Sequence, residues 1–260
     1  MAAPTLMPKT GLALAPLTAT VSPAAPIVLS AAVAANPKRY EIATRPRCVI
    51  DQGSLLCCVS CALASAMEAT NPYWPAMAPL FHYYFTRFEN AGAEPDGSLH
   101  LDSGLATLGR QGICRAALHD VPFTAEGAFA RPSPGACADA LTRLLARRHD
   151  HARVLQVTGL SPAAWMREQL DRDHPVVIAF QLPLGYPKAF LNAGQEWCDP
   201  NAGPLASNGH CALLTGYSDA RRAFHLQDSR GPGCFENGCW WLGYRVVDSP
   251  VLQTAYSLIP

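Results

Sequence analysis

The sequence lacks an excess of charge of either sign, because its 20 Lys and Arg residues balance 20 Asp and Glu residues. No segment carries a run of like charges. Surfaces that bind nucleic acids or anionic membranes are usually marked by a basic patch or stripe. The charge pattern therefore argues against a nucleic-acid partner and against a partner at a membrane surface.

The sequence also lacks an uninterrupted apolar segment long enough to span a membrane. Residues 12–35 are apolar and end in small residues, as a signal peptide does, but Pro16, Pro23 and Pro26 interrupt them. Proline removes a helical hydrogen bond, which rules against a spanning helix here. We expect residues 1–40 to form an Ala/Pro-rich leader, either disordered or a signal segment. An exported or delivered effector and a cytoplasmic protein both stay open.

Cysteine is too scarce for a disulfide-framed scaffold: the chain has ten in 260 residues, and 49% of its residues are hydrophobic. A core can therefore form without disulfides or a structural metal. Most of these cysteines are expected to be small buried side chains. A disulfide between Cys234 and Cys239 stays open, because the sequence alone does not settle pairing.

The first half of the sequence predicts helices. A strong helix is expected over residues 58–69, rich in Ala, Leu, Met and Glu and stopped by Asn71-Pro72. Further helices are predicted within residues 79–92, 103–110 and 136–151.

The second half predicts mainly strands. They are expected at residues 152–160, 174–183, 211–218, 223–229, 238–247 and 252–260, with one helix over 161–173 capped by Ser161. Helices followed by strands indicate an α+β fold over residues 41–260. We expect a helical lobe at 48–150, a β-rich, barrel-like lobe at 151–260, and a site in the cleft between them.

The segment DQGSLLCCVSCALASAME, residues 51–68, combines the features that a thiol nucleophile requires. Cys58 stands at the start of the predicted helix, where the partial positive charge of the helix end favours a thiolate. Gln52, six residues earlier, offers a side-chain amide that can donate to an oxyanion. The segment predicts a nucleophile and its oxyanion donor.

A base for this thiol is predicted in the second half of the chain. His210 follows a glycine at the entry to a strand, and Asp228 ends the next strand after the turn DARR. Antiparallel strands joined by a short turn have their outer ends side by side, so the two side chains are expected to meet. A carboxylate beside a histidine fixes its tautomer and orientation.

Residues 45–250 resemble the papain-like cysteine peptidase family, and its bacterial branch most. The likeness lies in Asp51-Gln52-Gly53, Cys58 and Glu68 of the first segment, and in GHCALLTGYSDARRAFHLQDSRG, residues 209–231. The resemblance implies Cys58 as nucleophile, His210 as base, Asp228 as orienting residue and Gln52 as oxyanion donor. It implies hydrolysis of peptide bonds through an acyl-enzyme intermediate, with no cofactor or metal.

The chain departs from the family at three places. Asp228 stands where the family usually has Asn, Arg230 where it has a Trp that shields the histidine, and Leu56-Cys57 where it has a small Gly-Ser pair. The resemblance implies that Leu56, Cys57, Asn208 and Gly209 contact the substrate, a peptide or protein.

Other readings stay open. The same Cys-His-Asp triad serves an amidase or a transglutaminase-like acyltransferase, and the departures allow a catalytically inactive binding module. A zinc site formed by Cys58, Cys61, Cys234 and Cys239 is a further alternative. The oligomeric state stays open.

Overall fold

The computed structural model describes residues 39–89, 98–146, 150–153, 160–186 and 195–259. Apart from Arg39 and Tyr40, the predicted leader lies outside these residues. Among the described residues, none of the helices has the length and apolar character that crossing a membrane requires.

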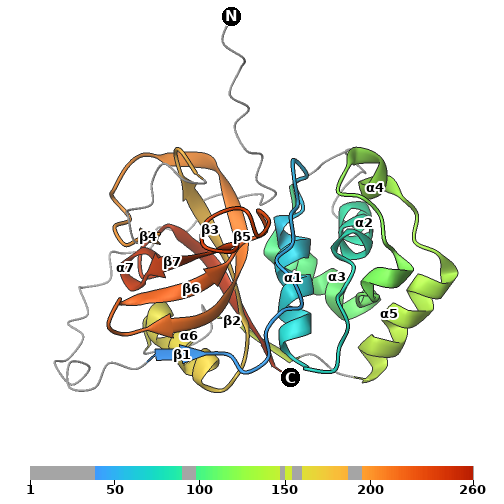
Figure 1. The fold of residues 1–260 in the computed structure, drawn as a ribbon, viewed down its shortest axis with the longest axis horizontal. Helices are drawn as coiled ribbons and strands as arrows, with labels where there is room; N and C mark the ends of the chain where they lie inside the picture. Colours follow the sequence, from blue (N-terminus) through green and yellow to red (C-terminus); the bar gives the residue numbers. More distant parts are fainter. Residues whose placement is uncertain (1–38, 90–97, 147–149, 154–159, 187–194, 260) are drawn as a thin grey trace, which may run out of the picture.

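Helices form one side of the molecule, as the first half of the sequence predicts (Figure 1). They are α1 (Cys58–Ala69), α2 (Pro79–Glu89), α3 (Leu101–Gln111), α4 (Ala125–Phe129) and α5 (Pro134–Ala146), with a 3-10 turn at Ala116–Leu118. The short α4 was not predicted. The fourth predicted helix ends earlier than expected, because Asp150 and His151 belong to a strand.

Helix α1 lies at the centre of the molecule, and all of its residues are buried. It packs against α2 and α3 on one side and against a long strand on the other. Gly104 of α3 makes the close packing possible, since a Cβ there would lie 2.6 Å from Cγ1 of Val59 and 3.0 Å from Cδ1 of Leu63. His82 of α2 fixes the same junction, with Nδ1 2.9 Å from the Ser60 hydroxyl and Nε2 2.8 Å from the Gly104 carbonyl.

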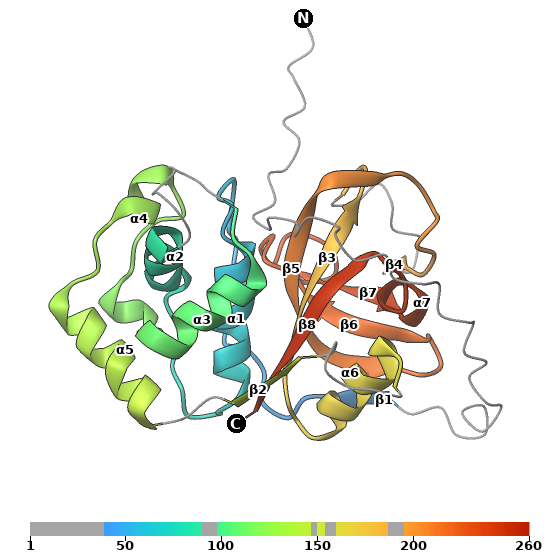
Figure 2. The same ribbon diagram turned by 180° about the vertical axis from the view of Figure 1, so that it is seen from behind.

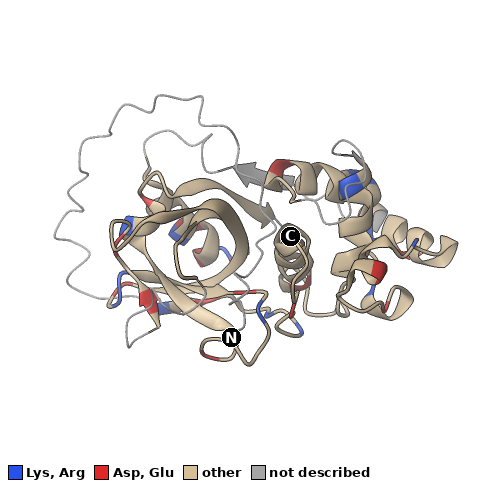
Figure 3. Cartoon of the chain, turned by 90° about the horizontal axis from the view of Figure 1, so that it is seen from above, with Lys and Arg blue, Asp and Glu red and all other residues tan. Residues whose placement is uncertain are grey.

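A single sheet forms the other side of the molecule (Figure 2). Its strands are β1 (Arg39–Glu41), β2 (Asp150–Arg153), β3 (Val176–Pro183), β4 (Glu196–Trp197), β5 (Leu205–Ser218), β6 (Ala223–Gln227), β7 (Cys239–Gly243) and β8 (Leu252–Ile259). The order is β2-β8-β3-β5-β6-β7-β4, and β1 pairs with β5. The described strands curl strongly (Figure 3) but follow an open path, so the term barrel-like fits only loosely.

The structure corrects one strand prediction. Residues 238–247 were expected to be one strand, but the strand ends at Gly243 and Tyr244–Val247 form the helix α7. The apolar residues of α7 are buried and it packs against α6 (Pro162–Asp171), so tertiary contacts override the β preference of its valines. Helix α6 is capped as predicted, since the Ser161 hydroxyl accepts from the Ala164 N–H.

Charged residues are spread over the described ribbon, with acidic and basic side chains interspersed (Figure 3). This arrangement agrees with the balanced composition.

Candidate active site

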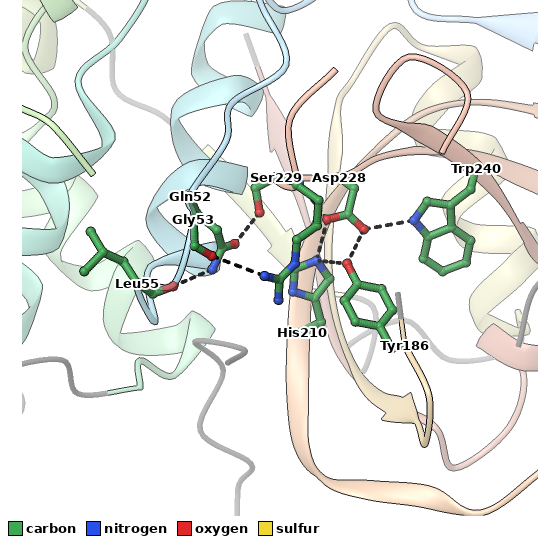
Figure 4. Close-up of polar contacts among 9 residues, drawn as sticks. Gln52, Gly53, Leu55, Tyr186, His210, Asp228, Ser229 and Trp240 are labelled. Atoms are coloured by element: carbon green, nitrogen blue, oxygen red, sulfur yellow. Dashed lines mark hydrogen bonds and ion pairs between the residues drawn. The ribbon is translucent and has the colours of Figure 1, made fainter. Parts of the chain in front are cut away.

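The structure brings Cys58, His210 and Asp228 to the junction of the helical side and the sheet. Cys58 is the first residue of α1, and His210 lies on β5, the strand that α1 packs against. Asp228 directly follows β6, which pairs antiparallel with β5 from Ser218 back to Leu213. The expected meeting of the strand ends occurs: His210 Nε2 lies 2.9 Å from Asp228 Oδ1 (Figure 4).

The surroundings of His210 favour its charged form. Burial alone would lower its pKa, but the charge and hydrogen bond of Asp228, together with the nearby Cys58 thiol, raise the pKa to about 9. Because Nε2 faces Asp228, the other ring nitrogen, Nδ1, is left for Cys58, whose thiol contributes to the raised pKa of His210. This is the orientation that a thiolate–imidazolium pair requires.

Asp228 is held as a carboxylate. Burial opposes its ionisation, whereas His210, Tyr186 and Trp240 lower its pKa to about 2. The Ser229 N–H also donates to Asp228 Oδ1, at 2.7 Å. A carboxylate in this position both orients the imidazole and stabilises its positive charge.

Gln52 is fully buried beside this group. Its side-chain amide nitrogen donates to the Leu55 carbonyl at 2.6 Å, while its side-chain oxygen accepts from the Ser229 hydroxyl (Figure 4). An amide nitrogen carries two hydrogens, so the second remains for a developing oxyanion. The predicted oxyanion donor thus lies close to the His210–Asp228 pair.

Glu68 fixes the segment that leads to Gln52. Its buried carboxylate accepts from the Arg47 N–H at 2.7 Å and from the Met77 N–H at 2.8 Å. Burial raises the pKa of Glu68, although these backbone donors act in the opposite sense. Glu68, in the last turn of α1, therefore has a structural role and lies far from the thiol at the other end of the helix.

The residues expected to bind substrate differ in exposure. Leu56 and Asn208 are half-buried, whereas Cys57 and Gly209 are buried. The Cys57 sulfur lies 3.7 Å from the Cys61 sulfur, inside the protein. The structure thus leaves Leu56 and Asn208 accessible to a ligand, and the role of all four residues stays a prediction.

Two further residues contact the orienting carboxylate. Tyr186 and Trp240 both donate to Asp228 Oδ2, at 2.6 and 2.9 Å (Figure 4). The sequence offers Trp240 and Trp241 as candidates for the wall of the cleft, and the structure selects Trp240 on β7. Nothing in the sequence singles out Tyr186, which lies in the turn after β3. Both contacts depend on tertiary packing.

The alternative metal site is not formed. Over the described parts of the chain, no group of three or more His, Cys, Asp and Glu side chains could hold a metal ion. Cys61 has Cys57, Cys58 and Cys211 as its neighbouring thiols. Cys239 carries a free thiol, so no disulfide joins it to Cys234.

Comparison by sequence finds no matching family model and no matching curated protein. Comparison of the structure finds xylellain, a cysteine protease from Xylella fastidiosa, with 21% identity, 96% of each chain covered and a TM-score of 0.72. The fold is that of the papain-like cysteine proteases. A digestive procathepsin L 3 of Tenebrio molitor matches with 15% identity over 85% of this chain and 69% of its own, at a TM-score of 0.60.

A plant structure extends the papain-like likeness to an inhibited enzyme. The Carica candamarcensis cysteine protease CMS1MS2, solved in complex with E-64, is 14% identical, and the match covers 82% of this chain and 93% of that one, with a TM-score of 0.55. At this level of identity the likeness concerns the papain-like fold. The chemistry of the site depends on the residues described above.

Proposed function

We propose that this protein is a papain-like cysteine peptidase that hydrolyses peptide bonds of a peptide or protein substrate. The observation that carries the proposal is the position of Cys58 at the N-terminus of α1, beside the buried His210–Asp228 pair. The papain-like fold, with proteases from bacterial, insect and plant sources as structural neighbours, supports the same reaction class.

The catalytic domain in this proposal is residues 41–260. Its helical lobe, 48–150, supplies Cys58 and Gln52, and its β-rich lobe, 151–260, supplies His210 and Asp228.

The geometry supports a two-step acyl transfer. The Cys58 thiolate attacks the scissile carbonyl, and the Gln52 amide donates to the oxygen as it becomes negative. His210, protonated at Nδ1, gives this proton to the leaving amine as the carbon–nitrogen bond breaks, which leaves an acyl group on Cys58. A water then gives its proton to His210 and attacks the acyl carbon, which releases the acid and restores the thiolate–imidazolium pair. Asp228 holds the ring throughout.

Cys58 and His210 are fully buried in this structure. A substrate reaches the thiol only when part of the surface around it opens. The rate at which a small electrophile labels Cys58 therefore reports both the reactivity of the thiolate and this opening.

The direct test is labelling of Cys58 by an epoxysuccinyl reagent at neutral pH, followed by mass spectrometry of the peptides. We expect one equivalent of label on Cys58, no label in Cys58→Ala and a large loss of rate in His210→Ala. Cys48→Ala, which removes an exposed thiol outside the site, is the matched control and should label normally. A folded wild-type protein that takes up no label at Cys58 would overturn the proposal.

A second measurement separates the peptidase from its rivals. Cleavage of a peptide library supports the peptidase, whereas amine incorporation or release of ammonia from small amides without cleavage supports an acyltransferase or amidase with the same triad. Labelling of Cys58 without any of these reactions would favour an inactive binding module.

A further inference from the structure

Tyr186 is placed beside the triad by the turn that follows β3. The turn is fixed at two points, where the Leu184 N–H donates to the Pro204 carbonyl at 2.8 Å and the Tyr186 N–H donates to the Pro183 carbonyl at 3.2 Å. The side chain points inward and is 5% exposed. These two backbone hydrogen bonds fix the turn that carries Tyr186.

The Tyr186 hydroxyl contacts both members of the histidine–aspartate pair. It donates to Asp228 Oδ2 at 2.6 Å and lies 3.2 Å from His210 Nε2 (Figure 4). The proton of this hydroxyl is retained, because burial and the Asp228 charge raise the pKa of Tyr186 well above its usual value. The phenol is therefore a permanent donor to the carboxylate.

Trp240 completes the set of donors. Its indole N–H reaches the same Oδ2 at 2.9 Å, while Oδ1 accepts from His210 and from the Ser229 N–H. Four donors around one carboxylate fix its plane as well as its charge, since each oxygen is approached from two directions. The orientation of the imidazole follows from the orientation of this carboxylate.

The Tyr186 ring also covers the pair. Its centroid lies 5.3 Å from that of the His210 ring, and the Arg230 guanidinium lies 5.5 Å above its centroid. Arg230 stands where the resembled family usually has a shielding Trp. Here Tyr186 packs against the histidine, beside Phe180 of β3, whose ring centroid lies 5.9 Å from that of His210. The Tyr186 ring thus covers the His210 side of the pair.

We propose that Tyr186, assisted by Trp240, is a positioning residue for the Cys58–His210–Asp228 triad, which fixes the Asp228 carboxylate and shields it from water. This inference rests on the proposed thiolate chemistry. It assigns to a loop tyrosine a role that the motif of the resembled family gives to a tryptophan after the orienting residue.

The test uses two tyrosines with the same hydrogen bond. Tyr186→Phe removes the hydroxyl at the site, and Tyr217→Phe removes a buried hydroxyl that donates to Asp171 at the same distance of 2.6 Å. We expect Tyr186→Phe to lower kcat roughly 10- to 100-fold with KM little changed, and to move the acid limb of kcat/KM to higher pH, because a carboxylate that loses a donor is protonated more readily. Tyr217→Phe should leave kcat and the pH profile unchanged.

The rate of Cys58 alkylation by iodoacetamide is measured alongside turnover, so that the two proposals fail separately. If peptides are not cleaved but Cys58 is alkylated, the proposed peptidase function fails, and a slower alkylation in Tyr186→Phe than in Tyr217→Phe still supports the positioning role. Tyr186 has no positioning role if Tyr186→Phe and Tyr217→Phe agree within twofold in kcat and in alkylation rate, and if the acid limb of kcat/KM lies at the same pH in both. Trp240→Phe is a second test, and we expect it to lower kcat and the rate of Cys58 alkylation as well.

Discussion

Gln52 and Ser229 are joined by two hydrogen bonds that run in opposite directions. The Ser229 hydroxyl donates to the Gln52 side-chain oxygen at 2.5 Å, and the Gln52 backbone N–H donates to the Ser229 carbonyl at 2.9 Å. Because Ser229 directly follows Asp228, the segment with the oxyanion donor is tied to the segment with the orienting carboxylate. The two halves of the proposed machinery are thereby held in one geometry, although 177 positions separate them in the sequence.

Ser229→Ala tests this connection. The Gln52 oxygen would lose its partner in a buried place, which costs about 1–3 kcal/mol. The amide that faces the oxyanion would also lose its fixed orientation, so we expect kcat to fall about tenfold or more, with a smaller change in KM. Steady-state kinetics and urea unfolding measure the two effects.

Thr215→Val is the matched control for Ser229→Ala. It removes a buried hydroxyl that lies 2.9 Å from His225 Nδ1, outside the site. A similar loss of stability with normal turnover is expected. Equal turnover in both variants would contradict the proposed role of the Ser229–Gln52 connection.

Gly104→Ala tests the packing that holds α1 in place. A Cβ at this position would lie 2.6 Å from Val59 Cγ1 and 3.0 Å from Leu63 Cδ1, so α3 must move away from α1. We expect a loss of about 1–3 kcal/mol in the free energy of unfolding. Gly109→Ala on the same helix has nothing within 4 Å and should be neutral or stabilising by up to about 1 kcal/mol. Chemical denaturation of both variants compares them, and equal stabilities would contradict the packing argument.

Much of the fold could be predicted from local features. The bounds of α1 follow from its run of helix-forming residues and the Asn71-Pro72 stop, and they agree with the structure. The meeting of His210 and Asp228 follows from a hairpin, in which a short turn fixes which strand ends lie together. Such features depend on neighbours in the sequence, which is why a single sequence reveals them.

The rest of the site depends on contacts between distant segments. Tyr186 reaches Asp228 across 42 positions, from the turn that follows β3. No periodicity or turn residue marks such a contact. The helix α7 was missed for a similar reason, since burial of Tyr244 and two valines against α6 decides its conformation.

The pH dependence of stability tests the charge state of the pair. The pKa of His210 is raised to about 9, above its ordinary value of 6.5, so its contribution is complete below pH 6.5 and is lost as pH rises through 9. The free energy of unfolding should fall by roughly 3 kcal/mol over this range. Burial lowers the pKa of His119, His174 and His225 from the ordinary value of 6.5, so these three histidines titrate below the range from pH 6.5 to 9.

Urea unfolding between pH 5 and 10 measures this dependence. His210→Ala should lack the fall between pH 6.5 and 9, and a wild-type protein whose stability is constant there would contradict a charged His210. Turnover should decline over the same range, because the leaving amine needs the imidazolium proton. Asp228 affects stability at acid pH. Because its pKa is lowered to about 2, its contribution to the free energy of unfolding is present above pH 3.8 and is lost as pH falls through 2.

Asp228→Asn gives the sharpest test of the site, because asparagine is the residue that the resembled family usually has there. In this protein, Oδ2 accepts from both Tyr186 and Trp240. If the amide nitrogen of the substituted side chain took the position of Oδ2, its hydrogens would face the Trp240 N–H. If the amide were flipped, so that the nitrogen took the position of Oδ1, its hydrogens would face the Ser229 N–H. Two donors would face each other in either orientation. We expect kcat/KM to fall roughly 100-fold, which corresponds to about 2–3 kcal/mol.

The double variant Asp228→Asn with Trp240→Phe decides whether this mismatch is the cause. Removal of the indole N–H leaves the amide nitrogen facing only the Tyr186 hydroxyl, which can rotate to accept from it. The double variant should therefore be more active than Asp228→Asn alone, although Trp240→Phe by itself lowers activity. Asp171→Asn is the matched control, since the Tyr217 hydroxyl can donate to an amide oxygen as well as to a carboxylate, and it should keep normal kcat/KM. If Asp228→Asn stays within threefold of wild type, the four donors do not select a carboxylate at this site.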